Sequence, residues 1–214
     1  MFVPRHYAQD DAAALDYLLA HDSFATLVST VAGEPFASHL PVMAHRDGGT
    51  VVFEGHMARA NPQWQELAAH PALLIVHGPH AYVSPSWYPQ PEHSVPTWNY
   101  AVAHAVGPVE LIHERDALAA LVAALAARYE DRVGSHWRFP ESAPSTTHEL
   151  AGIVGFRLRA QRLQVKYKLN QHHEPDKVRS AAAALARQPD PDARAVSALM
   201  LEQLARRQAP ETQP

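Results

Sequence analysis

The sequence contains no cysteine, and this absence excludes several kinds of chemistry at once. Without a thiol the chain can form no disulfide, no thiolate zinc site, no iron–sulfur cluster and no cysteine nucleophile. Long hydrophobic runs are also missing, because His, Gly or Arg interrupts each apolar stretch well short of the ~18 residues that a membrane span needs. The first residues show no basic segment followed by an apolar one. We therefore expect no secretory signal and a cytoplasmic protein.

Positive charge is scarce as well. Lys and Arg total 18 against 22 Asp and Glu, for a net charge of −4 with His neutral, and the lysines are Lys166, Lys168 and Lys177 alone. This balance disfavours a nucleic-acid binder that relies on bulk positive charge. The 214 residues are 47% hydrophobic and 19% charged, which is an ordinary globular composition. We expect one large domain, or one domain with an appendage.

Short β-rich segments separated by turns dominate the first half of the chain. Residues 23–31, 36–43 and 50–54 are separated by Ala-Gly-Glu-Pro and Asp-Gly-Gly, and this spacing predicts an antiparallel meander. Residues 72–77 form a fully apolar strand. Across residues 155–169 the apolar phase changes from even to odd positions, which predicts a bulge or tight turn between two strands.

Helices are predicted around these strands. Residues 114–130 carry one stripe of apolar residues at helical spacing, Leu118, Leu121, Val122, Leu125 and Tyr129. Near the C-terminus one helix begins close to Pro175. Asp190 caps a second, with Pro191 at its first position. About half a dozen strands with helices around them predict a mostly β protein with peripheral α-helices, built on a small antiparallel barrel.

The segment GHMARANPQW, residues 55–64, is the first candidate site, because a strand ends and a helix begins within it. Asn61 is a good N-cap, and Pro62 suits the first helical position. Free N–H groups at a helix start bind phosphate, with which Arg59 could pair bidentately and to which His56 could donate. A capped helix with a solvated arginine explains the same residues, so the pattern leaves both interpretations open.

The second candidate is the segment GPHAYVSPSWYPQPEHSVPTWNY, residues 78–100. It contains five aromatic residues, Tyr82, Trp87, Tyr88, Trp98 and Tyr100. Its prolines exclude a helix and stiffen the chain, so residues 78–96 are predicted to be a loop. Rigid aromatic rings with interspersed Ser, Thr and Asn suit a flat, hydrogen-bonding ligand. A long loop whose aromatic residues cover the core is the alternative.

Other polar segments are less specific. Ser38 and His39 are neighbours in a predicted strand, so one of the two must face the interior. Two of the three lysines lie in KYKLNQ, residues 166–171, where solvated and ligand-facing positions are both open. The 15 histidines include no HExxH frame, so we predict no metal site. Ser84 and Ser86 lie in no GxSxG frame, and we assign no residue a catalytic role.

Taken together, these segments resemble the PaiB family of FMN-binding negative transcriptional regulators. The matches are MFVPRHY, ASHLP, GHMARANPQW, GPHAYVSPSWY, VPTWNY and KYKLNQ, in family order from Met1 to Gln171. Asn170 stands where the family more often has serine. The resemblance implies an FMN-binding split β-barrel, antiparallel and Greek-key-like, shared with pyridoxamine-phosphate-oxidase-like proteins. It would occupy residues 1–171, with residues 172–214 as a C-terminal helical extension packed on the barrel.

The resemblance also implies a homodimer with FMN at the subunit interface. The FMN phosphate would lie near His56, Met57, Ala58, Arg59 and Asn61. Ser38 and His39 would face the phosphate or the ribityl chain. The isoalloxazine ring would lie near Trp87, Tyr88, Thr97, Trp98 and Asn99, with Lys168 and Gln171 as further polar contacts.

The resemblance leaves the function open between a transcriptional regulator and a flavin-dependent oxidoreductase. One alternative is a repressor that binds DNA directly through the tail helices. The second of these offers only Arg194, Arg206 and Arg207, and a recognition helix needs several side chains that contact bases and phosphates. A haem-handling split barrel is another alternative. The intact GHMARANPQW segment argues against a barrel that has lost its cofactor.

Overall fold

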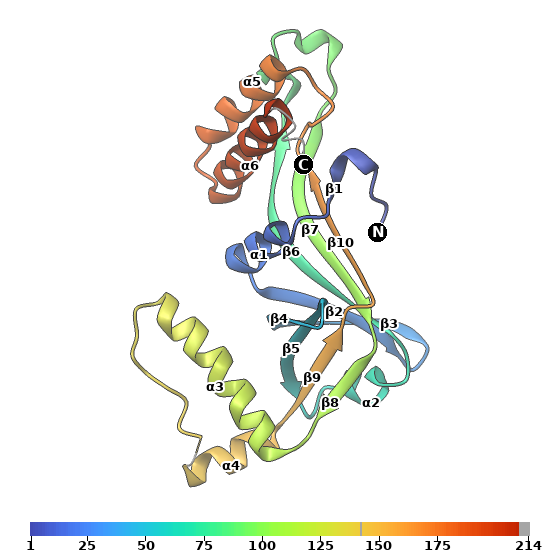
Figure 1. Cartoon of the computed structure of the whole chain (residues 1–214), viewed down its shortest axis with the longest axis vertical. Coiled ribbons are helices and arrows are strands. Elements are labelled where there is room, and N and C mark those ends of the chain that lie inside the picture. The colour runs from blue at the N-terminus through green and yellow to red at the C-terminus, as the bar shows by residue number, and fades with distance from the viewer. Residues whose placement is uncertain (142, 210–214) are drawn as a thin grey trace. The chain divides into compact units, whose positions relative to one another are not determined.

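The computed structural model describes residues 1–141 and 143–209 (Figure 1). The strands are β1 (Ala8–Gln9), β2 (Phe24–Val31), β3 (Glu34–Pro41), β4 (Met43–Asp47), β5 (Thr50–Ala58), β6 (Ala72–Val83), β7 (Thr97–Gly107), β8 (Val109–Ile112), β9 (Ile153–Arg159) and β10 (Arg162–Lys168). The α-helices are α1 (Ala12–His21), α2 (Gln63–Leu67), α3 (Arg115–Arg132), α4 (Pro144–Ala151), α5 (Pro175–Ala186) and α6 (Pro191–Gln208). Three single turns of 3-10 helix are η1 (Arg5–Tyr7), η2 (Pro85–Trp87) and η3 (Pro91–His93).

The chain forms two compact units, each built from separate stretches of sequence. The first unit consists of Met1–His21, His77–Ala103 and the segment that begins at Gln164, and the second of Asp22–Val76 and His104–Leu163. The helical extension predicted for residues 172–214 falls in the first unit as far as it is described, and residues 210–214 lie outside the described ranges. The boundary at residue 171 stays a prediction. None of the helices within the described ranges combines the length and apolarity that crossing a bilayer requires.

The second unit contains two antiparallel arrangements of strands. Strand β2 pairs with β3, where Leu27 is opposite Ser38, and on its other side with β6. A separate four-stranded sheet has the order β4-β5-β9-β8. The predicted single meander is therefore wrong, because β2 and β3 lie in one sheet and β4 and β5 in another. The chain changes sheets at Val42, which is fully buried and whose N–H donates to the Ser23 carbonyl at 2.9 Å.

The core of the second unit explains its helices. The predicted stripe of α3 faces inward, and its leucines pack in one apolar cluster with Ile112 and Leu150. Leu150 belongs to α4, a helix for which the sequence gives no clear periodic signal. This helix forms because burial of Leu150 against α3 stabilises a short segment with weak helical patterning. The hydroxyl of the buried Thr146 also donates to the Pro140 carbonyl at 2.7 Å.

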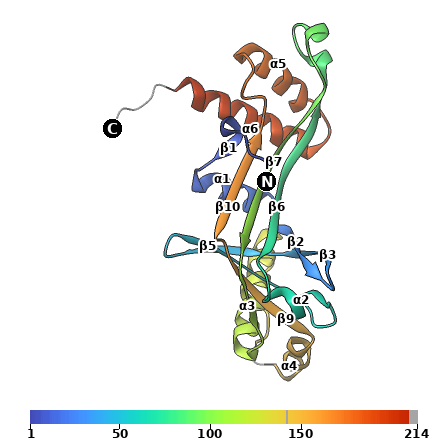
Figure 2. The ribbon, with the colours of Figure 1, turned by 90° about the vertical axis from the view of Figure 1, so that its right-hand side faces the viewer.

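In the first unit, β10 is paired with β1, where Ala8 is opposite Lys166, and β7 lies between β10 and β6. Figure 2 shows β10, β7 and β6 running side by side. The change of apolar phase corresponds to the two-residue turn between β9 and β10, which confirms that prediction. Strand β6 continues six residues past His77 to Val83, so the predicted loop is shorter. Its Gly78 is closely packed: a Cβ there would lie 2.3 Å from Leu18 of α1.

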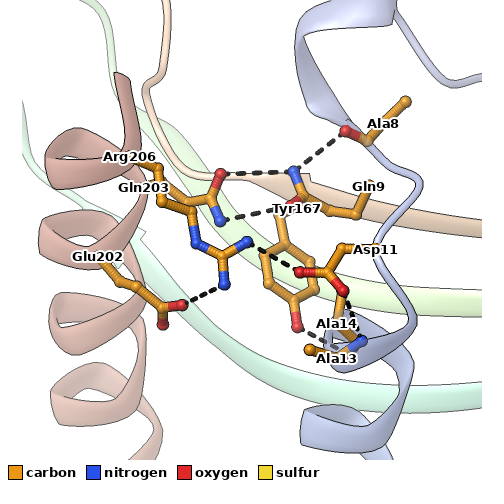
Figure 3. A network of polar contacts seen from close by, with 9 residues as sticks. All are labelled: Ala8, Gln9, Asp11, Ala13, Ala14, Tyr167, Glu202, Gln203 and Arg206. Carbon is orange, nitrogen blue, oxygen red and sulfur yellow. Dashed lines mark hydrogen bonds and ion pairs between the residues drawn. The ribbon is translucent and has the colours of Figure 1, made fainter. Parts of the chain in front are cut away.

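Both predicted tail helices are present, and α5 and α6 pack against each other (Figure 1). The Asp190 carboxylate caps α6 by accepting from the Asp192 N–H at 3.0 Å. Polar contacts join α6 to the N-terminal segment (Figure 3). Arg206 donates to Asp11 at 3.3 Å, and the Tyr167 hydroxyl of β10 donates to the Ala14 carbonyl at 2.8 Å. Helix α6 is therefore built into the first unit.

Candidate functional site

The first candidate segment differs from its prediction in one respect. His56, Met57 and Ala58 belong to β5 and do not follow it, because β9 continues to pair with them: His56 is opposite Gly155, and Ala58 is opposite Ile153. Helix α2 has only five residues. Such a helix has almost no macrodipole, since that dipole is the sum over many aligned peptides. A phosphate here would depend on side chains and on the turn between β5 and α2, residues 59–62, named below the β5–α2 turn.

Asn61 fixes the β5–α2 turn to the rest of the second unit. Its side-chain oxygen accepts from the N–H of Gln63, the first residue of α2, at 3.0 Å, although Pro62 and not Asn61 occupies the N-cap position. Its Nδ2 donates to the Ser38 hydroxyl on β3 at 2.7 Å. Two residues 23 positions apart in sequence, both predicted for the cofactor site, are thus in direct contact.

Arg59 holds the other side of the same turn. Its Nε donates to the Ala151 carbonyl at 2.8 Å and its Nη2 to the Ile153 carbonyl at 2.9 Å. The guanidinium carbon lies 6.0 Å from the Trp64 ring centre, and the indole N–H donates to the Arg59 carbonyl at 2.8 Å. Arg59 also lines a cavity of about 360 Å³ with His113 and Arg115. The arginine predicted to contact phosphate therefore already serves two main-chain carbonyls.

Gln63 is a positioning residue that the sequence patterns did not identify. It is completely buried. Its amide nitrogen donates to the Leu27 carbonyl at 3.1 Å, the Ser29 hydroxyl at 3.0 Å and the Phe36 carbonyl at 3.3 Å. These acceptors lie on β2 and β3, so Gln63 sets α2 and Asn61 against the strand that carries Ser38. The one sequence feature that could have identified Gln63 is a polar residue at a position of this short helix where an apolar residue is expected.

The predicted pair Ser38 and His39 is divided between the two faces of β3. Ser38 is half-buried and bonded to Asn61, whereas His39 is exposed on the opposite face. Within one chain, only Ser38 shares the Asn61 side of the strand. The strand's period of two is the physical reason, and contact of His39 with the same ligand stays a prediction.

Among the predicted site residues of the second unit that the structure describes, His56 has a buried polar atom without a hydrogen-bond partner. Its Nδ1 is buried and has no hydrogen-bond partner among the residues that the structure describes. Burial lowers the pKa of His56, so the imidazole is neutral at physiological pH. Its strand packs closely on its neighbours, since a Cβ at Gly55 would lie 2.9 Å from the Pro41 carbonyl of β3. An unpaired polar atom in such a place is costly unless a ligand or water completes it.

Three predicted residues come together in the first unit. The Lys168 ammonium donates to the Thr97 hydroxyl in a very short contact and to the Trp98 carbonyl at 2.7 Å. Gln171 serves the backbone instead: its side-chain oxygen accepts from the Leu169 N–H at 2.7 Å, and its amide nitrogen donates to the Tyr167 carbonyl. Gln171 therefore fixes the end of β10.

Asn99 lies in the interior of the first unit, and its place beside the flavin ring stays a prediction. The residue is fully buried, and its Nδ2 lies 3.3 Å from the Met200 sulfur of α6. The cause is alternation along β7: Asn99 points to the face that α6 covers, whereas its neighbour Trp98 points outward and is exposed.

Trp98 belongs to an aromatic cluster on the first unit. Its ring lies 6.1 Å from that of Tyr82 and 6.0 Å from that of His80. With Trp87 they line a cavity of about 400 Å³. Exposed, mutually packed rings of this kind suit a planar partner, as expected from the sequence.

Tyr88 takes a different position from Trp87, although the two are adjacent. It is buried, and its hydroxyl accepts from the Asn170 amide at 2.8 Å. Asn170 has a positive φ of 63°, a conformation that asparagine adopts more readily than serine. This explains the departure from the family pattern, since the amide both tolerates the turn and reaches Tyr88.

The predicted residues thus form two groups, one in each unit. The second unit contains Ser38, His39, His56, Met57, Ala58, Arg59 and Asn61, and the first contains Trp87, Tyr88, Thr97, Trp98, Asn99, Lys168 and Gln171.

Sequence comparison supplies the family. A sequence model described as "Putative FMN-binding domain" matches residues 1–162. The chain belongs to this FMN-binding family. "Protease synthase and sporulation protein PAI 2" of Bacillus subtilis (strain 168) is 32% identical over 206 residues, which cover 95% of this chain and 98% of that protein. The PaiB resemblance and the cofactor prediction, FMN, are confirmed.

Structural comparison supplies the fold. The flavocytochrome Anf3 from Azotobacter vinelandii matches with a TM-score of 0.60 and 16% identity, over 90% of this chain and 78% of that chain. The FAD and heme binding protein from Mycobacterium smegmatis matches with a TM-score of 0.58 and 22% identity, over 80% and 78%. These likenesses confirm the predicted fold, a flavin-type split barrel with antiparallel sheets and C-terminal helices.

The residues of the second unit fit an FMN phosphate and its ribityl chain. Both carry oxygens that need hydrogen-bond donors. The β5–α2 turn offers the Asn61 amide, β3 offers the Ser38 hydroxyl, and β5 offers the unmatched Nδ1 of His56. Because Gln63 and Arg59 hold this turn from two sides, the donors are fixed in place before any ligand arrives.

Proposed function

We propose that the protein is a homodimeric, redox-active FMN protein in which the β5–α2 turn of the second unit holds the flavin phosphate and ribityl chain. The observation that carries this proposal is the direct Asn61–Ser38 contact beside a strand with an unmet buried nitrogen on His56. When bound, FMN supplies hydride or single-electron transfer. The chain's own residues bind and orient the cofactor: Ser38 and Asn61 donate to its oxygens, and Arg59 keeps the turn in place.

The aromatic cluster of the first unit supports the predicted ring contacts. Trp98 and Tyr82 are 53% and 44% exposed, which is unusual for large apolar side chains and typical of binding surfaces. We propose that this cluster contacts the isoalloxazine ring or the second subunit. A Trp98→Ala variant should then change the flavin absorption band or the dimer mass, measured by spectroscopy and by light scattering after gel filtration. A variant unchanged in both would contradict this assignment.

A regulatory role through direct DNA contact receives no support from α6. Arg194 donates to the carbonyls of Gln188 and Pro189 at 3.0 and 2.8 Å, and Arg206 donates to Asp11 and Glu202. Side chains that serve the protein's own backbone and carboxylates are poorly placed to contact phosphates and bases. We propose that any effect on transcription is indirect, through the flavin state or a product, in the cytoplasm as expected from the sequence.

The proposal is tested by titrating flavin-free protein with FMN and following the quenching of flavin fluorescence. Ser38→Ala and Asn61→Ala should each weaken FMN by about tenfold, the scale of a hydrogen bond to a charged group. Gln65→Ala is the matched control, because Gln65 is exposed on α2, two residues past the buried Gln63, and should change nothing.

Equal affinity in all variants would overturn the assignment of the β5–α2 turn. Random duplex DNA in low salt, titrated in parallel, should not bind. Micromolar, strongly salt-dependent binding would favour the repressor alternative instead.

A further inference from the structure

The first unit contains a second cavity, of about 200 Å³, at the end of β10 and the start of α5. Its lining residues come from three separated stretches of the chain and are Tyr88, His93, Ser94, Val95, Thr97, Lys168, Asn170, His172, His173 and Lys177. None of them is acidic, whereas five carry a lysine or histidine side chain. The phosphate assignment made above for the second unit does not use this cavity, whereas Tyr88, Thr97 and Lys168 are also among the predicted contacts of the flavin ring.

The two lysines contact uncharged partners. The Lys177 ammonium lies 4.5 Å from the centre of the Tyr88 ring, over its face. Lys168 donates to the Thr97 hydroxyl and the Trp98 carbonyl. Neither ammonium forms an ion pair with a carboxylate in the described ranges, although 22 acidic residues are present in the chain. Two positive charges therefore face one small cavity with no carboxylate paired to either, and the Glu92 carboxylate lies 3.8 Å from His93, another lining residue.

His172 and His173 lie among the same positive charges. The rings of His172 and His173 are 4.0 Å apart, and His172 Nδ1 lies 3.1 Å from the Tyr7 hydroxyl. Burial lowers the pKa of both, and every neighbouring charge that adds to this effect is cationic: His6, Lys168, Lys177 and Arg207 for His172, and His172 and Lys177 for His173. The positive charges that disfavour protonation of these histidines would favour an anion in the cavity.

We propose that this cavity is a second binding site, for the oxyanion of a small molecule such as a phosphate ester or a carboxylate. Lys177 and Lys168 supply the counter-charge, and the Thr97 hydroxyl and the histidine ring nitrogens supply hydrogen bonds. Tyr88, held by Asn170, forms the wall against which Lys177 rests. The site lies wholly within the first unit and goes beyond the FMN site, because it requires no flavin to form.

The test uses FMN-loaded protein in low-salt, phosphate-free buffer, titrated with sodium phosphate in a calorimeter while flavin absorbance is read. Saturable binding is expected, and Lys177→Gln and Lys168→Gln should each weaken it about tenfold. Lys177→Arg, which keeps the charge, should retain most of the affinity and shows that the helix still folds. Arg179→Gln is the matched control, since it removes one positive charge from the exposed face of α5, where Arg179 pairs with Asp176 at 3.2 Å.

Sodium acetate is titrated in the same way, because comparison of the two anions separates a phosphate ligand from a carboxylate ligand. Three results would overturn the proposal. The first contrary result is that neither phosphate nor acetate binds saturably. The second is equal weakening by Lys177→Gln and Arg179→Gln, which would indicate general charge attraction. The third is release of flavin as phosphate binds, which would assign the cavity to the cofactor. Failure of the FMN proposal is distinguishable, because it would appear as missing flavin bands before any phosphate is added.

Discussion

Each unit has a cavity lined by two cationic side chains, and the two cavities differ in what those cations contact. In the second unit, Arg59 and Arg115 donate to main-chain carbonyls and to one carboxylate, so their donors already serve the fold. In the first unit, Lys168 and Lys177 contact a hydroxyl, a carbonyl and a ring face. Cations near a cavity therefore do not by themselves identify a binding site. The difference that matters is whether the N–H donors are already used by the fold, and the Lys177 ammonium, which lies over a ring face, contrasts with Arg59 in this respect.

The largest expected effect concerns the hydrogen bonds that support the second unit. Gln63→Leu removes a buried amide with three acceptors and should lower the free energy of unfolding by about 2–3 kcal/mol. Chemical denaturation measures this. Gln65→Leu on the exposed side of the same helix should stay within about 0.5 kcal/mol of wild type. If both variants lose the same stability, Gln63 has no special role in positioning the turn.

In the first unit, Asn170 is the residue whose buried side-chain hydrogen bond corresponds to those of Gln63. Asn170→Ala loses the bond to the Tyr88 hydroxyl and places a Cβ-bearing residue without a local hydrogen bond at φ 63°. It should destabilise the protein by about 2 kcal/mol. Asn170→Gly loses the same bond but tolerates the backbone, and should cost about 1 kcal/mol less than the alanine variant. A glycine variant less stable than the alanine variant would show that backbone strain is not part of the cost.

The smallest effect is a pH dependence that arises in the first unit. Burial, with His172 and Lys177 nearby, lowers the pKa of His173 from 6.5 to about 4. Between these values the unfolded chain binds a proton that the folded chain does not, so stability falls as the pH is lowered through this window. His173→Asn should make the decline shallower, and His70→Asn, at an exposed site, should leave it unchanged. Identical pH profiles for His173→Asn and wild type would contradict this cause.

The sequence predicted those elements that are marked by a pattern within a few neighbouring residues. The apolar stripe located α3, the change of phase located the β9–β10 turn, and Asp190 with Pro191 located α6. The features that the sequence did not predict depend on packing between distant segments. No local pattern indicates that the chain changes sheets at Val42, that α6 covers Asn99, or that Leu150 stabilises a helix in a loop-like sequence.

Like the fold, the candidate site could be predicted only in part from the sequence. The family motifs selected Ser38 and Asn61, which are in contact, but they gave no sign that Arg59 serves two carbonyls or that His39 faces away. Lys177 and the adjacent histidines lie beyond the matched motifs. Their grouping with Lys168 arises only because the end of β10 and the start of α5 fold around one cavity.

The most direct test of the central claim is an absorbance spectrum of the purified protein, repeated after adding FMN and passing the sample through a desalting column. Flavin bands that survive desalting at about one FMN per chain are expected in the wild type, with lower occupancy in the Asn61→Ala variant. A folded wild-type protein that emerges free of flavin would contradict the claim that the β5–α2 turn holds FMN.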